Sequence, residues 1–216
     1  MTVTAKILSY EDGKLTVIPS EPISRELMQK NVSSVEIRLT DGRTITPEQR
    51  RAIFATIRDI SMWSGHEPEY LRTYLTWDFC AKHEEEPFSL SDCTVTTARE
   101  FMNYLIDFCL TWSVPTKESL SSRSDDSGRY MYYCIEHSKC AVCNMPGEVH
   151  HVDTVGANGG NRKRIDHRGL RAVCLCREHH MQAHTNESEF FSAHHLEPIR
   201  LDDYLCRIHH MNTNPQ

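Results

Sequence analysis

The hydrophobic and polar positions of the amino-terminal segment alternate in short runs separated by turn residues. Apolar runs at 5–9 and 15–18 flank a Glu-Asp-Gly-Lys turn, which predicts two strands. A further run at 35–39 leads into Asp41-Gly42, a strong hairpin signal, and predicts a third strand. We therefore expect this part of the chain to form β-structure with tight turns.

The pattern then changes to the helical period of 3.6 residues. Thr46 precedes a proline and is followed three residues later by Gln49, a capping box that predicts the start of a helix. Two more apolar stripes have helical spacing. One begins at Pro68, and the other extends over about 95–112. After the strands, the sequence thus predicts three helices with apolar faces.

A polar segment separates these helices from the rest of the chain. Residues 116–130 are rich in Ser and Asp, a composition typical of linkers. We therefore predict a β-then-helical domain over 1–115, a linker over 116–130 and a second domain over 131–216, in an α+β fold.

Composition and charge exclude several classes of protein. The chain has 216 residues, of which 39% are hydrophobic and 25% charged, so it is not mainly disordered or fibrous. The net charge of −6 argues against a broadly basic surface. However, residues 1–115 hold 12 Lys and Arg against 17 Asp and Glu, whereas residues 116–216 hold 12 against 13. Because no apolar run is long enough to span a membrane and no signal-peptide pattern is present, we expect a cytoplasmic protein without membrane association.

Histidine and cysteine are the unusual part of the composition. The chain has 13 His and 9 Cys, and 11 of the histidines lie at or after His137. In a reducing compartment, clustered thiols are expected to bind metal rather than to form disulfides. Six cysteines in other surroundings are expected to be simply buried: Cys80, Cys93, Cys109, Cys134, Cys174 and Cys206.

Two pairs of potential metal ligands share the same spacing. Cys140 and Cys143 are separated by two residues, and so are Cys176 and His179. Together they have the ligand types and the pairing of a closed tetrahedral zinc site. In a small domain such a site adds its metal-binding free energy to folding, so we predict a zinc-stapled domain.

The remaining clustered histidines are spaced for a second site. His180 and His184 are four residues apart, so on a helix both rings project from one face. His150 and His151 are adjacent, and on a strand they point in opposite directions. One can then bind a cation while the other accepts a proton from water, a division of roles that suits phosphodiester hydrolysis.

The order of these motifs resembles the zinc-binding variant of the HNH nuclease family, which has a ββα-metal fold. In that variant a first Cys-x-x-Cys precedes a strand ending in Asp-His or His-His, and a second ligand pair opens a helix that continues as His-x-x-x-His. The resemblance implies a metal-dependent DNA endonuclease in which His151 is the general base. The implied ligands of the catalytic divalent cation, which is Mg²⁺, Mn²⁺, Ni²⁺ or Zn²⁺, are His150, His180 and His184. The implied ligands of a structural Zn²⁺ are Cys140, Cys143, Cys176 and His179.

One position departs from the family pattern. Many members carry an asparagine before the leucine that leads into the second zinc pair, whereas here Gly169 precedes Leu170. Spacing leaves four candidates to take the place of that asparagine: Asn158, Asn161, Asp153 and His167. A nuclease-like fold without activity is the alternative at this point.

A basic segment lies between the two halves of the motif. The glycine-rich stretch 156–160 is followed by Arg162, Lys163 and Arg164, and Arg168 is close by in sequence. Glycine lets a backbone approach a polyanion closely, and Lys and Arg pair with phosphates. We predict that these four side chains bind DNA; a solvated basic loop is the alternative.

Residues 46–115 carry a second, weaker resemblance, based on their apolar pattern and short phrases such as Ile-Thr-Pro-Glu-Gln-Arg-Arg at 45–51. They are similar to HNH nucleases of phages and prophages, whose helical amino-terminal part is similar to the lambda Orf (NinB) recombination mediator. This resemblance implies single-stranded or branched DNA as the substrate, and a phage recombinase or single-strand-binding protein as a partner in the host cytoplasm. A homodimer is compatible with it, because many nucleases cut both strands as dimers. The alternative function is a non-catalytic single-stranded-DNA-binding mediator with a zinc-stapled module.

Overall fold

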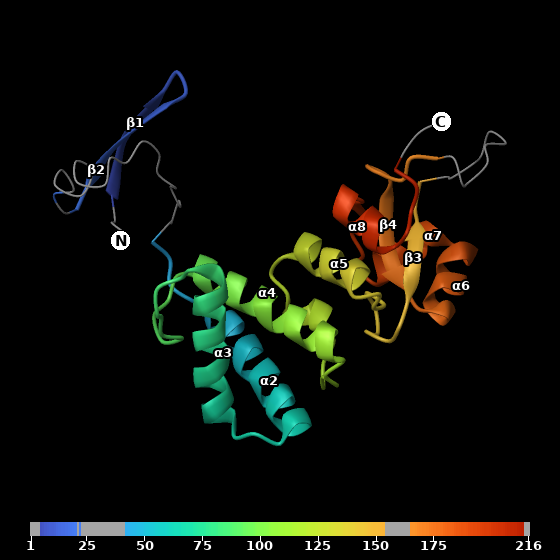
Figure 1. Ribbon diagram of the computed structural model, residues 1–216, viewed down its shortest axis with the longest axis horizontal. Helices are drawn as coiled ribbons and strands as arrows, with labels where there is room; N and C mark the ends of the chain where they lie inside the picture. The colour runs from blue at the N-terminus through green and yellow to red at the C-terminus, as the bar shows by residue number, and fades with distance from the viewer. Residues whose placement is uncertain (1–4, 21, 23–41, 154–164, 214–216) are drawn as a thin grey trace. The chain divides into compact units, whose positions relative to one another are not determined.

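The computed structural model describes residues 5–20, 22, 42–153 and 165–213 (Figure 1). The chain divides into two units, 1–41 and 42–216, and the fold is α+β. The strand predicted at 35–39 lies outside the described residues, as does the glycine-rich stretch 156–160.

The first unit contains an antiparallel hairpin. Strand β1 (Ala5–Glu11) pairs with β2 (Lys14–Pro19), and Glu11 lies opposite Lys14. Asp12 and Gly13 connect them with φ values of 48° and 74°, which is the left-handed geometry that two-residue hairpins favour. The two strands predicted for this region are therefore confirmed.

Three long helices open the second unit, as the hydrophobic period predicted. They are α2 (Pro47–Ser64), α3 (Pro68–His83) and α4 (Val95–Trp112). The capping box is present, because Thr46 Oγ1 accepts from the Gln49 amide at 3.1 Å while Gln49 Oε1 accepts from the Thr46 amide at 3.1 Å. The buried faces of these helices form one core that includes Ile53, Phe79 and Phe101.

The polar segment 116–130 packs against α2. It contains a 3₁₀ helix, η1 (Leu120–Arg123), and the start of α5 (Ser127–Glu136). The Arg123 guanidinium lies 2.8 Å from an Asp59 carboxylate oxygen, and both side chains are nearly inaccessible to solvent, at 3% and 4% exposure. A buried ion pair is strongly destabilising to break, because removal of one partner leaves an uncompensated charge. This segment therefore contributes buried contacts as well as polar surface.

The carboxy-terminal region is a three-stranded antiparallel sheet with helices on both sides (Figure 1). The strands are β3 (Glu148–His151), β4 (Arg171–Leu175) and β5 (Ile199–Arg200), in the order β3-β4-β5. The helices are α6 (Arg177–Thr185), α7 (Glu187–Ala193) and α8 (Asp203–Ile208). The start of β3 pairs with the end of β4, at Glu148 and Leu175, and α6 begins directly after β4. The two halves of the Cys/His pattern are therefore brought to the same end of the sheet.

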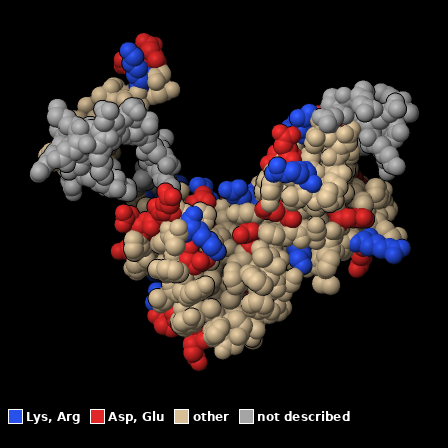
Figure 2. All heavy atoms as spheres, in the orientation of Figure 1, with Lys and Arg blue, Asp and Glu red and all other residues tan. Residues whose placement is uncertain are grey.

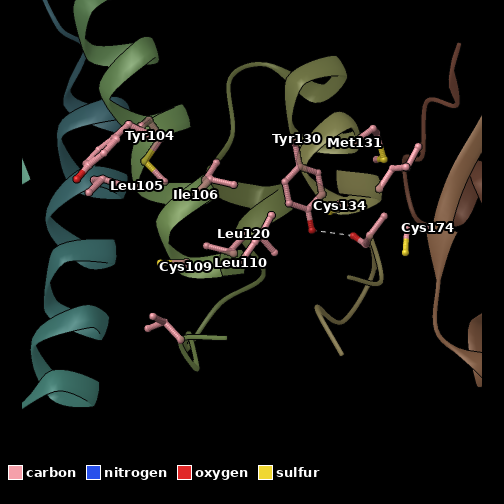
Figure 3. Packing of buried hydrophobic residues seen from close by; sticks show 14 of the residues in the cluster. Tyr104, Leu105, Ile106, Cys109, Leu110, Leu120, Tyr130, Met131, Cys134 and Cys174 are labelled. Carbon is pink, nitrogen blue, oxygen red and sulfur yellow. Dashed lines mark hydrogen bonds between the residues drawn. The ribbon is translucent and has the colours of Figure 1, made fainter. Parts of the chain in front are cut away.

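One continuous core runs from α4 through α5 to β4 (Figure 3). The Tyr130 hydroxyl is buried there and donates to the Ala141 carbonyl at 2.9 Å, which ties α5 to the segment before β3. Five of the cysteines expected to be buried are buried, and Cys80 is half-buried. Among the described helices, none combines the length and apolar character that crossing a membrane requires.

Candidate functional site

Three cysteines and one histidine converge at the end of the sheet. Cys140 and Cys143 lie in the segment before β3, Cys176 caps α6 and His179 is in its first turn. The Cys143 and Cys176 sulfurs are 3.8 Å apart, and His179 Nδ1 lies 3.1 to 3.6 Å from the three sulfurs. With Zn–S of about 2.3 Å and Zn–N of about 2.0–2.1 Å, a tetrahedron has S–S edges of about 3.8 Å and S–N edges of about 3.5–3.6 Å. The four residues therefore fit a zinc ion.

A tight turn holds the first two cysteines in place. The Asn144 amide donates to the Cys140 carbonyl at 2.8 Å, and the Cys140 amide donates to the Met145 carbonyl at 2.8 Å. Asn144 has a left-handed φ of 57°, and its side-chain amide donates to the Tyr130 hydroxyl at 2.9 Å. A Cβ on Gly147 would lie 2.9 Å from the Leu175 backbone, so a glycine is needed where this segment enters β3. The turn is thus anchored to α5 and β4.

The second pair of ligands uses a helix amino-terminus. Burial raises the pKa of the Cys176 thiol, but hydrogen bonds from the His179 backbone N–H, the Cys143 and Cys140 thiols and the Glu178 backbone N–H together more than offset this effect, and the pKa is lowered overall. Helix amino-termini favour the thiolate, which is the form that binds metal. The local fold therefore prepares Cys176 for ligation.

Three histidines form a second cluster. His150 comes from β3, and His180 and His184 come from one face of α6. Their candidate ligand atoms all lie within 4.8 Å of one another, and the ring centroids of His150 lie 4.7 and 4.9 Å from those of His180 and His184. The structure thus brings together the three residues that the sequence predicted as one site. Adjacent residues of α6, His179 and His180, belong to different clusters.

Two glutamates contact this cluster and were not predicted. Glu187 Oε1 lies 2.9 Å from His150 Nε2, and Glu148 Oε1 lies 2.7 Å from His180 Nδ1. Burial lowers the pKa of His150, and the Glu187 carboxylate offsets this only in part, which favours the neutral ring that a metal requires. Strand alternation places Glu148 on the same face as His150, a signal that could have been used; nothing in the spacing indicates Glu187.

The predicted general base contacts a further histidine. His167 Nδ1 lies 2.9 Å from His151 Nε2. Of the four candidates for the missing asparagine, Asn158 and Asn161 lie outside the described residues. Asp153 instead pairs with Arg171, whose backbone amide and guanidinium both donate to it. His167, one of the two described candidates, thus contacts His151.

The carboxy-terminal segment holds the loop that carries His167. The His167 amide donates to the Asn212 carbonyl at 3.0 Å, and the Gly169 amide donates to the Leu201 carbonyl at 2.8 Å. Gly169, at the position of the family asparagine, has a φ of 77°, a left-handed conformation that glycine adopts without strain. The end of the chain thus helps to form the site.

The predicted DNA contacts are only partly described. Arg162, Lys163 and Arg164 lie outside the described residues. Arg168 is exposed, and its guanidinium binds the Asp166 carboxylate, with Asp203 at 3.4 Å. On the face that Figure 2 shows, acidic and basic side chains of the described residues are interspersed.

A family model described as "Putative HNHc nuclease" matches residues 17–212, which is most of the chain. No curated protein and no solved structure matches.

Proposed function

Because the chain belongs to the HNHc nuclease family, we propose that it is a divalent-metal-dependent endonuclease that hydrolyses DNA phosphodiester bonds. The observation that carries this proposal is the convergence of His150, His180 and His184 beside His151. Three imidazoles form a ligand set with room for further ligands, which is a feature of catalytic rather than structural metal sites.

The chain's own residues have separable roles in this reaction. When bound by His150, His180 and His184, a divalent cation supplies polarisation of the scissile phosphate and stabilisation of the leaving oxygen. His151, which follows His150 on β3, accepts the proton of the attacking water. His167 positions the His151 ring through the contact between Nδ1 and Nε2. The Cys₃His cluster holds a structural zinc that keeps β3 and α6 together.

The test is a nicking assay with zinc-loaded protein and added Mg²⁺, Mn²⁺ or Ni²⁺. We expect wild-type protein to nick plasmid, single-stranded or branched DNA, and His151→Ala to lower the rate by about 10²–10⁴-fold, the usual contribution of a general base. His195→Ala, which removes an exposed histidine outside both clusters, is the matched control and retains the wild-type rate. Failure of wild-type protein with every metal, or equal rates for His151→Ala and wild type, would contradict the proposal.

For the substrate, we propose single-stranded or branched DNA in phage recombination, on the resemblance of residues 46–115 to the Orf (NinB) mediator. Exposed rings on α3 support binding of unpaired bases. Tyr70, Tyr74 and Trp77 are 56%, 45% and 65% exposed, and their successive centroids lie 6.2 and 6.5 Å apart. Bases stack on such rings with little regard to sequence.

The charges of α3 indicate which interaction binds DNA at this helix. Arg72 pairs with Glu69, and Lys82 lies 2.7 Å from Asp78, so both cations of α3 already have carboxylate partners. On α3, stacking rather than phosphate pairing should then supply the affinity, whereas the predicted contacts of Arg162, Lys163, Arg164 and Arg168 with phosphates supply the salt-dependent part. We expect Trp77→Leu to weaken binding of oligo-dT without changing how steeply the affinity falls with salt. An unchanged affinity of Trp77→Leu for oligo-dT would show that DNA binds elsewhere.

The same exposed rings favour the second candidate, a DNA-binding mediator without catalysis. Metal content separates the two, because the nuclease binds two metals per chain and the mediator only one, at the Cys₃His cluster.

A further inference from the structure

In the histidine cluster, two of the three rings each have one nitrogen that faces a glutamate carboxylate. His150 Nε2 faces Glu187, and His180 Nδ1 faces Glu148, at 2.9 and 2.7 Å. Neither glutamate belongs to the group of three residues whose ligand atoms converge. Each carboxylate thus engages one nitrogen of its ring, which leaves the other nitrogen of that ring for a cation.

This arrangement has a known chemical consequence. A histidine that binds metal through one nitrogen commonly donates the other N–H to a carboxylate, which determines the tautomer and orients the ring. We propose that Glu187 and Glu148 are positioning residues of the metal site. Glu187 directs His150 to bind through Nδ1, and Glu148 directs His180 to bind through Nε2. This inference rests on the proposed function, because it concerns the same cation.

The local fold explains how Glu187 reaches His150. Asn186 ends α6 and also caps α7, where its side chain accepts from the Glu189 amide, so the two helices follow each other without a loop. Glu187 is the first residue of α7 and is thereby turned back toward the sheet. The connection brings together two residues that are 37 positions apart in sequence.

The two contacts differ in burial and therefore in expected strength. His150 is only 2% exposed and Glu187 40% exposed, whereas His180 is 21% exposed and Glu148 69% exposed. Exposed charge pairs contribute little because water screens them. We therefore assign the larger effect to Glu187.

The first measurement is the affinity of the zinc-loaded protein for Mn²⁺ by calorimetry. Removal of such a carboxylate lowers metal affinity by about 10- to 100-fold, so we expect Glu187→Ala to raise the Kd by this factor. Glu148→Ala should have a smaller effect. Glu187→Gln keeps an oxygen that can accept the ring N–H, and should restore part of the loss. Glu189→Ala is the matched control in the same turn of α7, since the Glu189 carboxylate binds Asn186 rather than a histidine.

The second measurement separates positioning from a general loss of stability. Nitrogen NMR of the histidine rings, in protein with zinc but without Mn²⁺, should show the proton of His150 on Nε2 and that of His180 on Nδ1. Glu187→Ala should mix the His150 tautomers while the thermal midpoint stays close to that of Glu189→Ala. Unchanged tautomers and an unchanged Kd in Glu187→Ala would overturn the inference.

The two proposals fail in different ways. Wild-type protein that binds no Mn²⁺ and cleaves no DNA would contradict the proposed function. Wild-type protein that binds Mn²⁺ and cleaves DNA, with Glu187→Ala indistinguishable from it in both measurements, would contradict only the role of Glu187.

Discussion

The two clusters share helix α6 but are built differently. In the Cys₃His cluster, four ligands surround a volume that matches one zinc ion, and Cys140 is fully buried. In the histidine cluster only three ligands converge, His184 is exposed, and carboxylates rather than further ligands contact the rings. The first cluster has the four ligands of a closed site, whereas the second has three ligands, the number that catalytic metal sites take from the protein.

This difference predicts that, within the carboxy-terminal region, the Cys₃His cluster supports folding and the histidine cluster supports catalysis. A four-coordinate site uses all of its ligands to hold segments together, so its metal contributes directly to folding. The histidine cluster depends on a sheet and helix that the first cluster holds in place. We therefore expect loss of the metal at the Cys₃His cluster to unfold the carboxy-terminal region, and loss of the metal at the histidine cluster to abolish only activity.

The largest expected effect comes from breaking the closed site. Structural zinc sites bind with about 10–16 kcal/mol in zinc-finger peptides, which is as large as the stability of a typical domain. Cys140→Ser combined with Cys143→Ser should therefore abolish zinc binding and the cooperative thermal transition of the carboxy-terminal region. Circular dichroism and zinc content provide the measurement. Cys80→Ser, outside both clusters, should keep zinc. A double variant that lacks zinc and melts at the wild-type temperature would show that this cluster does not support the fold.

A smaller loss of stability, together with a complete loss of activity, is expected from breaking the histidine cluster. His184→Ala should reduce the metal content from two ions per chain to one and abolish nicking. Because His184 is exposed, its removal should change the free energy of unfolding by only about 0.5 kcal/mol. Metal analysis and thermal unfolding test this, with His195→Ala as the control. If His184→Ala unfolds as the cysteine variant does, the contrast between the two clusters is wrong.

The smallest effect is expected from removing His167, which contacts the predicted general base. His167→Ala removes the contact to His151 without touching the three predicted metal ligands, so metal content should stay at two per chain. A small misplacement of a reacting group can cost about 10²-fold in rate, and we expect a decrease up to that size. Single-turnover cleavage at saturating DNA measures it. His167→Asn, which supplies the residue type common in the family, should retain more activity than His167→Ala. Wild-type rates in His167→Ala would exclude a positioning role.

Local patterns predicted the helices and grouped the candidate metal ligands as the structure groups them. The capping box at Thr46 and the stripe ending at Trp112 gave helix bounds that the structure confirms. His180 and His184 lie on one face of α6 because four residues are close to one helical turn. Such features depend on backbone geometry over a few residues, which sequence spacing reports directly.

The residues that support the site could not be assigned in this way. Spacing gave no indication of Glu187, which is 37 positions from His150, and left His167, 16 positions from His151, as one of four candidates. Likewise, the polar composition of 116–130 predicted a linker and gave no indication that Arg123 is buried against Asp59, from which it is separated by 64 positions in the numbering. These contacts depend on how loops close and where helices begin, and composition contains little information on either.

The sequence by itself therefore determined the types of candidate ligand, their grouping and their order along the chain. Paired cysteines and histidines at this spacing are typical of zinc sites, and the affinity of thiolate and imidazole for metal is a property of the side chains themselves. Only the tertiary structure decided which side chains contact the candidate ligands and the predicted general base. The second nitrogen of each ring can meet any polar group that packing brings near it, and here packing brought Glu148, Glu187 and His167.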